Sequence, residues 1–73
     1  MKLYTKTVCP KCIGVKAIIA EEEILVELIN IDNDASAHRK LLDNNISSVP
    51  VLEVNGQLIT DINTIYATIV SGV

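Results

Sequence analysis

Apolar and polar positions alternate in blocks along the chain, and the blocks predict seven short elements. A β-favouring run at Leu3–Thr5 predicts a strand, which Thr7–Pro10 stops. Proline at the first helical position is pre-set for a helix, so a helix should begin at Pro10 with Cys9 as its N-cap. Three glutamates, Glu21–Glu23, end this helix on a solvated corner. Its predicted apolar face, at helical spacing, consists of Ile13, Val15, Ala17, Ile18, Ile19 and Ala20.

The middle of the chain predicts a buried strand followed by a short helix. Leu25–Ile31 is apolar almost throughout and rich in β-branched residues, which suits a strand covered on both faces, as in a parallel sheet. Asp32–Asp34 offers turn and N-cap residues, so a second helix is expected at about Ala35–Asp43. Asn44 and Asn45 can end it in a left-handed conformation. The residues expected to share one side of this helix are His38, Leu41 and Leu42.

The last third of the chain predicts a hairpin and an amphipathic helix. The apolar runs Val51–Val54 and Gln57–Ile59 flank an Asn-Gly pair, the strongest short-range hairpin signal. From Ile62 to Val70, apolar residues recur at i, i+3, i+4, i+7 and i+8, with Thr60 or Asp61 as N-cap. The order β-α-β-α-β-β-α therefore predicts an α/β fold with a mixed four-stranded sheet and helices on its faces. The first two strands should be parallel, because a crossover helix joins them.

Composition narrows the class of protein. A chain of 73 residues is long enough for one domain, spanning residues 1–73. Hydrophobic residues make up 49%, which excludes intrinsic disorder, and a net charge of −3 without a basic cluster argues against nucleic acid as a partner. No apolar stretch approaches the roughly 20 residues of a membrane span, and the N-terminus lacks a signal-peptide pattern. We therefore expect a cytoplasmic monomer without a membrane partner.

The most specific chemical feature is the Cys9-x-x-Cys12 motif at the predicted strand-to-helix junction. A thiolate at Cys9 would face the unpaired N–H groups of the first helical turn, and the helix dipole favours negative charge there. Such sites lower a thiol pKa from about 8.5 to roughly 3.5–7.5. Lys6 and Lys11 add positive potential, while Cys12 should be shielded one turn into the helix. We predict that Cys9 attacks a substrate disulfide and that Cys12 resolves the mixed disulfide.

A metal site is the alternative use of this cysteine pair. Zinc and iron–sulfur clusters usually take four protein ligands, whereas the sole histidine, His38, lies on another predicted helix. A zinc site would therefore need a dimer or carboxylate ligands. An iron–sulfur cluster would need Cys9 and Cys12 from two chains, or from chains together with glutathione. An inert structural disulfide is less expected in a cytoplasmic protein, where thiols are kept reduced.

Val49-Pro50, at the entry to the third predicted strand, bears on the same site. Most X-Pro bonds are trans, and Pro is tolerated at the first residue of a strand. A cis bond would instead turn the Val49 backbone outward beside Cys9, where it could pair with an extended peptide or glutathione. The residues alone leave both states open.

Taken together, these motifs resemble those of glutaredoxins and of the small glutaredoxin-like redoxins that reduce ribonucleotide reductase. The resemblance runs in register over about residues 2–70 and rests on Tyr4–Cys12, Ile29–Asp32, Ser48–Pro50 and Val54–Gln57. It implies a thioredoxin-like fold, a cis Pro50, Cys9 as nucleophile, Cys12 as resolving thiol and no tightly bound cofactor. The implied activity is that of a thiol–disulfide oxidoreductase, which would act in electron transport and in cell redox homeostasis. Its substrates would be disulfide-containing proteins, such as ribonucleotide reductase, or glutathione mixed disulfides.

The resemblance also implies a glutathione site. Glutaredoxins contact glutathione through a lysine at the position of Lys6, through the residue at the position of Lys11, and through the backbone before the cis proline, here Val49. Their helix N-terminus at the position of Asp61 and Ile62 receives a glutathione carboxylate, since backbone N–H groups there bind anions.

This chain departs from the glutaredoxin pattern at two of these places. Lys11 stands where the family usually has tyrosine, and Thr60–Asn63 replaces a Gly-Gly-x-Asp sequence. Asp61 thereby brings a negative charge to the expected carboxylate site. The Trp-Ser-Gly-Phe stretch of redoxins served by thioredoxin reductase is missing too. The electron donor thus stays open between glutathione and an enzyme of the thioredoxin reductase type.

Overall fold

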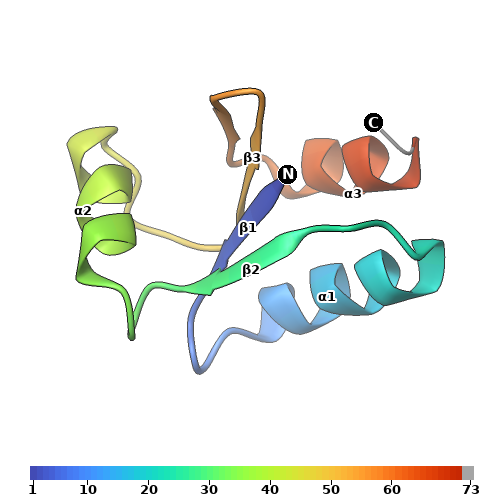
Figure 1. The fold of residues 1–73 in the computed structure, drawn as a ribbon, viewed down its shortest axis with the longest axis horizontal. Coiled ribbons are helices and arrows are strands. Elements are labelled where there is room, and N and C mark those ends of the chain that lie inside the picture. The colour runs from blue at the N-terminus through green and yellow to red at the C-terminus, as the bar shows by residue number, and fades with distance from the viewer. Residues whose placement is uncertain (72–73) are drawn as a thin grey trace.

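The computed structural model describes residues 1–71 and contains the seven predicted elements in the predicted order (Figure 1). The α2 helix and both hairpin strands have the predicted bounds. The strands are β1 (Lys2–Thr5), β2 (Glu27–Asn30), β3 (Val51–Val54) and β4 (Gln57–Ile59), and the helices are α1 (Pro10–Glu22), α2 (Ala35–Asp43) and α3 (Ile62–Val70).

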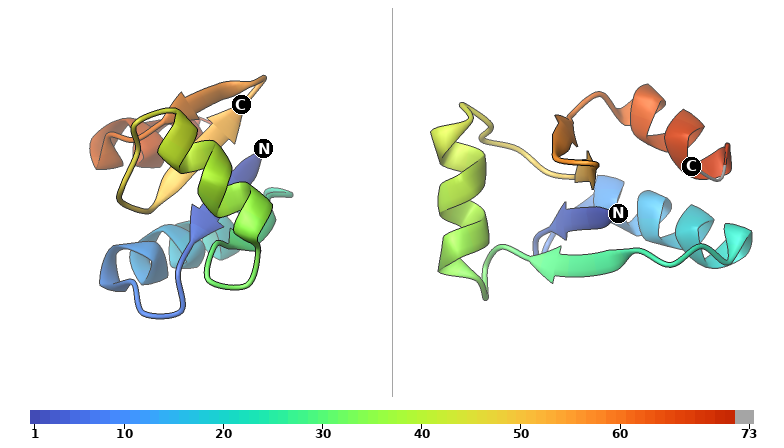
Figure 2. Two further views of the ribbon diagram at one scale, coloured as in Figure 1. Left: turned by 90° about the vertical axis from the view of Figure 1, so that its left-hand side faces the viewer. Right: turned by 45° about the horizontal axis from the view of Figure 1, so that its top comes forward.

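The strands form one mixed sheet in the order β2-β1-β3-β4. The β1 strand pairs in parallel with β2 and antiparallel with β3, and the β3–β4 hairpin is antiparallel, as predicted. Helices α1 and α3 lie on one side of the sheet and α2 on the other (Figure 2). A hydrogen bond from the Ile31 N–H to the Thr5 carbonyl, 2.9 Å, follows the β1–β2 ladder. Beyond this hydrogen bond the two segments separate: the one after β1 leads to α1, and the one after β2 leads to α2.

The core is aliphatic and lies on both faces of the sheet, because successive strand side chains point to opposite faces. Leu3 and Leu52 pack with α1 and α3, whereas Tyr4 and Val51 pack beneath α2. Each fully buried aliphatic side chain contributes about 1.5–3 kcal/mol, so these two layers fix the helices on the sheet. The other buried members are Val15, Ile19, Ile65 and Ile69 in the first layer, and Ile31, Ala37 and Leu41 in the second.

Residues with positive φ occupy the predicted turns. Asn55 and Gly56, with φ of 50° and 82°, form the turn between β3 and β4, where a type I′ turn requires positive φ at both positions. Asn45, with φ of 60°, lies just after the end of α2, as predicted. Glu23, with φ of 55°, ends α1. Local sequence signals therefore set the ends of these elements.

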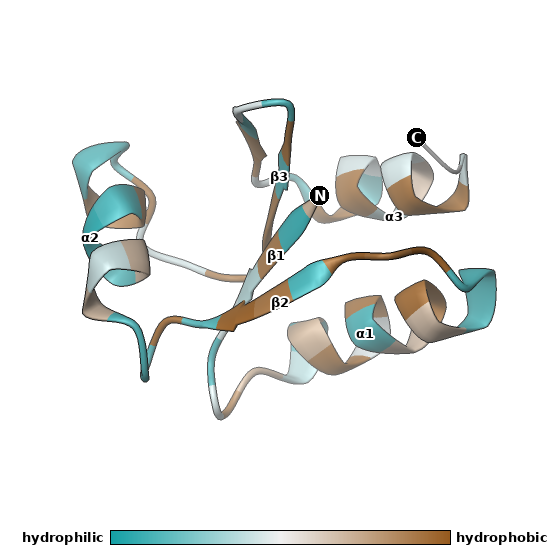
Figure 3. Ribbon diagram, viewed as in Figure 1, coloured by the Kyte–Doolittle hydropathy of each residue, from teal (hydrophilic) through white to brown (hydrophobic). Residues whose placement is uncertain are grey.

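The second strand differs from its prediction. It spans only Glu27–Asn30 instead of Leu25–Ile31, and it lies at the edge of the sheet, so it is not covered on both faces. Leu25 is 95% exposed and Leu28 is 54% exposed. In Figure 3 the hydrophobic colour runs along β2 and the segment before it, at the rim of the fold. Apolar patterning indicates an extended segment here but does not specify its place in the sheet.

All three helices also bury a narrower stripe than predicted. The α1 helix turns Cys12, Val15 and Ile19 inward, and α2 turns Ala37 and Leu41 inward. A short helix contacts the rest of a small molecule along one line, so apolar side chains on its flanks stay at the surface. The exposed members of the predicted apolar faces are Ile13, Ala17, Ala20, His38, Leu42 and, on α3, Val70.

Candidate active site

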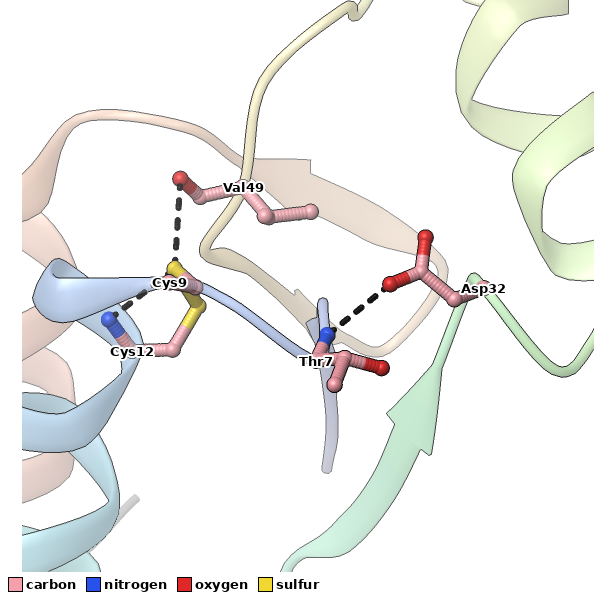
Figure 4. The surroundings of a disulfide bond; sticks show 5 residues. All are labelled: Thr7, Cys9, Cys12, Asp32 and Val49. Atoms are coloured by element: carbon pink, nitrogen blue, oxygen red, sulfur yellow. Dashed lines mark hydrogen bonds between the residues drawn. A yellow bond between two sulfur atoms is a disulfide. The ribbon is translucent and has the colours of Figure 1, made fainter.

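Cys9 and Cys12 form a disulfide at the N-terminus of α1 (Figure 4). Cys9 is the N-cap residue, as predicted, with extended backbone dihedrals, and its Sγ accepts a hydrogen bond of 3.1 Å from the Cys12 N–H. The sulfur thus satisfies one of the N–H groups that a helix N-terminus leaves without a partner. Cys12 is 1% exposed, whereas Cys9 is only half-buried. A substrate can therefore reach Cys9 but not Cys12.

The same geometry favours a thiolate at Cys9 when the pair is reduced. A negatively charged sulfur would accept the Cys12 amide hydrogen bond and lie at the positive end of the α1 dipole. Burial instead disfavours charge on the Cys12 sulfur. Access and electrostatics thus both point to Cys9 as the attacking sulfur.

The Val49–Pro50 peptide bond is cis, as the resemblance implied. It places the Val49 carbonyl oxygen 3.9 Å from the Cys9 Sγ (Figure 4). Pro50 is buried and leads directly into β3, while Val49 is half-buried. An extended chain lying along the Val49 backbone would pass next to the reactive sulfur.

A set of three hydrogen bonds, which we call the Thr7 clamp, holds the loop that leads into Cys9. The Thr7 N–H donates to Asp32 Oδ2 at 2.9 Å, Asn30 Nδ2 donates to Thr7 Oγ1 at 3.2 Å, and the Asp32 N–H donates to Asn30 Oδ1 at 2.8 Å. The hydrogen bonds from Thr7, together with the nearby charges of Lys6 and His38, lower the pKa of the Asp32 carboxyl.

Sequence reasoning missed the Thr7 clamp. It assigned Asp32 to a turn or N-cap and Asn30 to a buried strand, and it noted both in the family resemblance without giving either a partner. A polar residue that interrupts an apolar run is the signal that could have pointed to a partner outside the strand.

The residues predicted to bind glutathione belong to several elements of the fold. Lys6 and Lys11 are exposed on either side of Cys9 in the chain. Asp61 is the N-cap of α3, where its carboxylate accepts hydrogen bonds from the Thr64 hydroxyl at 2.8 Å and the Thr64 N–H at 2.9 Å, which lower its pKa. Ile62 is half-buried and packs against the core. Their part in binding stays a prediction.

Two exposed apolar side chains flank the cysteine pair in the sequence. Val8 is 84% exposed and Ile13 is 68% exposed, although the helical pattern placed Ile13 in the core. Among residues 1–71, no three histidine, cysteine or acidic side chains gather as a metal ion would require. Within that same range, none of the helices combines the length and apolarity needed to cross a membrane.

Comparisons with known proteins agree with this geometry. The structure resembles crystal structures of the thioredoxin-like protein BC3987. For a point mutant of that protein the TM-score is 0.82 at 23% identity, covering 99% of this chain and 95% of that chain. A second BC3987 structure gives a TM-score of 0.74 at 27% identity, covering 84% and 85%. These likenesses show the thioredoxin-like fold.

Sequence comparison adds the family. A search of curated proteins found no significant match. The family model described as Glutaredoxin matches residues 1–59, a segment that contains both cysteines and the cis proline. The chain belongs to the glutaredoxin family.

Proposed function

We propose that this protein is a dithiol oxidoreductase that reduces disulfides in other proteins, with Cys9 attacking and Cys12 resolving. The observation that carries the proposal is the cysteine pair at the α1 N-terminus, where only Cys9 is accessible. Family membership supports thiol–disulfide chemistry in general. The division of roles and the substrate class are our inference.

The proposed reaction passes two electrons from the cysteine pair to the substrate. The Cys9 thiolate attacks one sulfur of a substrate disulfide, and the bond between the two substrate sulfurs breaks to release a thiolate. Cys12 then loses its proton and attacks the Cys9 sulfur of the mixed disulfide. The second substrate thiolate leaves, and Cys9 and Cys12 end as the disulfide. No resident cofactor takes part, but an external thiol or reductase must reduce the pair for the next cycle.

The exposed apolar side chains favour protein substrates. Val8 and Ile13 flank the cysteine pair in sequence, and the Val49 carbonyl lies beside the sulfur, so an extended segment could pack on side chains and backbone together. Glutathione mixed disulfides offer little apolar surface for such packing. We therefore place protein disulfides ahead of glutathione mixed disulfides as substrates.

Asp61 supports an electron donor other than glutathione. Its carboxylate already accepts the Thr64 N–H at the start of α3, where the family resemblance implies a carboxylate of glutathione. Two negative charges at one helix N-terminus repel each other. We therefore expect slow turnover with glutathione and glutathione reductase as the electron donor, and NADPH with thioredoxin reductase is the donor system to compare with it.

Two cysteine variants test the reaction itself. We expect Cys9→Ser to abolish reduction of a protein disulfide, such as that of insulin, and Cys12→Ser to accumulate a mixed disulfide with it, detectable by mass spectrometry. Residual turnover in Cys9→Ser, or an adduct carried by Cys12, would contradict the assigned roles.

A matched pair of surface variants tests the substrate class. Val8→Ser should raise the KM for the protein disulfide while leaving that for 2-hydroxyethyl disulfide unchanged. Leu25→Ser is the control, because Leu25 is 95% exposed and lies beyond the opposite end of α1 from Cys9. Equal effects of the two variants would argue against docking beside the cysteines.

A further inference from the structure

The loop between β1 and Cys9 lies where the segments that follow β1 and β2 diverge. After the hydrogen bond from the Ile31 N–H to the Thr5 carbonyl, residues 6–8 turn toward α1 and residues 32–34 turn toward α2. The side chains of Thr7, Val8 and Lys6 are exposed, so core packing does not hold this loop. Another interaction must fix the backbone that enters the active site.

The Thr7 clamp supplies that interaction. Asp32 binds the backbone of Thr7, two residues before Cys9, and Asn30 joins Asp32 to the Thr7 hydroxyl. Figure 4 shows the Asp32 carboxylate reaching from the loop after β2 to the Thr7 amide. Asp32 itself does not touch either sulfur. Any effect of Asp32 on the position of Cys9 must therefore pass through the Thr7 backbone.

We propose that Asp32, supported by Asn30, is a positioning residue for Cys9. By holding the Thr7 backbone, it keeps the Cys9 Sγ at the Cys12 amide, 3.1 Å away, and beside the Val49 carbonyl, 3.9 Å away. This inference rests on the proposed function, because it concerns the sulfur that attacks. Misplacing a reacting group by about 1 Å can cost on the order of a hundredfold in rate.

Asp32 acts on the Cys9 thiol in two ways of opposite sign. Its negative charge disfavours a thiolate at Cys9, whereas the positive charges of Lys6 and Lys11, on either side of Cys9 in the chain, favour one. Its hydrogen bond to Thr7 favours the thiolate by keeping the sulfur at the α1 N-terminus. We infer that positioning outweighs charge.

The alkylation rate of Cys9 by iodoacetamide, measured against pH, separates the two effects. The reaction is followed in a Cys12→Ser background, which leaves one thiol and keeps the amide of residue 12. Loss of positioning in Asp32→Ala or Asn30→Ala should move the midpoint of the profile to higher pH. Below the midpoint, the rate should fall about threefold to tenfold, since the thiolate fraction changes tenfold per pH unit. Asp32→Asn keeps an acceptor for the Thr7 N–H and should not move the midpoint upward.

Asp43→Ala is the matched control. It removes the same charge at the other end of α2, where Asp43 pairs only with the exposed Arg39, and it should leave the profile unchanged. A midpoint that falls or stays constant in Asp32→Ala would overturn the proposal, as would an upward shift of the same size in Asp32→Asn. Partial unfolding would also raise the midpoint, toward the ordinary thiol pKa of about 8.5. Circular dichroism must therefore show that the variants are folded, and the rate above the midpoint must stay at the parent value, since it would rise for a more accessible unfolded thiol.

The readout also distinguishes this inference from the proposed function. Alkylation needs no substrate disulfide. One outcome is that Asp32→Ala shows the expected shift of the alkylation midpoint although the protein reduces no disulfide. That result would refute the proposed function and leave the positioning role intact. An active protein whose profile does not respond to Asp32→Ala or Asn30→Ala would refute the positioning role alone.

Discussion

Three aspartates of this small protein bind backbone amides. Asp34 accepts the Ala37 N–H at 3.0 Å and Asp61 accepts the Thr64 N–H at 2.9 Å, so each caps a helix. Asp32 instead anchors a loop through Thr7. At the residue scale, a carboxylate here mainly fixes the start of a segment, and its removal should loosen that segment before the rest of the fold.

Asp61 offers a test that separates capping from charge. Asp61→Ala should lower the midpoint of thermal unfolding by roughly 4–8 °C, because the Thr64 N–H loses its acceptor. Asp61→Asn keeps an oxygen at that place and should lower it by less. If the α3 N-terminus receives glutathione, Asp61→Asn should also lower the KM for glutathione about twofold to tenfold, more so at low salt. Altered stability with unchanged glutathione kinetics in both variants would remove the support for another donor.

At the element scale, the contact between α1 and α3 depends on a missing side chain. A Cβ at Gly14 would collide with the Tyr66 hydroxyl, so glycine leaves room for the end of this α3 side chain against α1. Glycine inside a helix is itself unfavourable by roughly 0.5–1 kcal/mol relative to alanine. The unfavourable glycine inside α1 is thus explained by its packing against Tyr66.

Gly14→Ala should therefore destabilise the protein despite the better helix propensity of alanine. Overpacking costs about 1–3 kcal/mol, which exceeds the propensity gain, so we expect a net loss of about 0.5–2 kcal/mol in the free energy of unfolding. In the Tyr66→Phe background the colliding oxygen is gone, and Gly14→Ala should become neutral or stabilising. Urea unfolding of both single variants and the double variant measures this coupling. Additive effects would show that Tyr66 is not the obstacle.

Elements that are determined by residues close to them in the sequence could be predicted, whereas features that depend on distant contacts could not. The β3–β4 hairpin and α2 were predicted with their bounds, because Asn55–Gly56 and Asp34 act within a few residues of what they specify. The β2 edge position was not, since the order of strands depends on contacts across the whole chain.

The candidate site divides in the same way. The Cys9–Cys12 pair and the N-cap position of Cys9 could be read from the motif, since they lie within one helical turn. The cis state of Pro50 came only from the family resemblance. Asp32 lies 25 residues from Thr7, and a turn residue carries no mark of such a partner. Exposure of Ile13 depended on how α1 sits against the sheet and α3.

At the scale of the whole molecule, several carboxylates make stability depend on acid pH. The pKa values of Asp32, Asp61 and Glu53 are lowered in the folded state, the last by hydrogen bonds from Lys40 at 2.7 Å and Tyr4 at 2.6 Å. The unfolded chain therefore takes up protons first as the pH falls. The stabilisation is complete above the unfolded pKa and is lost as the pH falls through the folded one.

We thus expect the free energy of unfolding to stay level from about pH 7 to 5 and to decline below about pH 4. Glu53→Gln should flatten this decline, because it removes one group whose pKa differs between the two states. Urea denaturation at a series of pH values is the measurement. A decline that is equally steep in Glu53→Gln would assign the acid sensitivity to other carboxylates.

The exposed β2 edge has a consequence for behaviour in concentrated solution. An apolar strand with free edge amides can recruit the same strand of another molecule, and a charged residue on it hinders such stacking. Glu27 is the only charged residue between the exposed Leu25 and Leu28. We therefore expect its charge to oppose the pairing of this edge with another molecule. Glu27→Val should leave the fold intact yet increase light scattering during prolonged incubation, whereas Glu22→Val, at the end of α1, should not. The edge strand of the sheet would then limit the solubility of this protein.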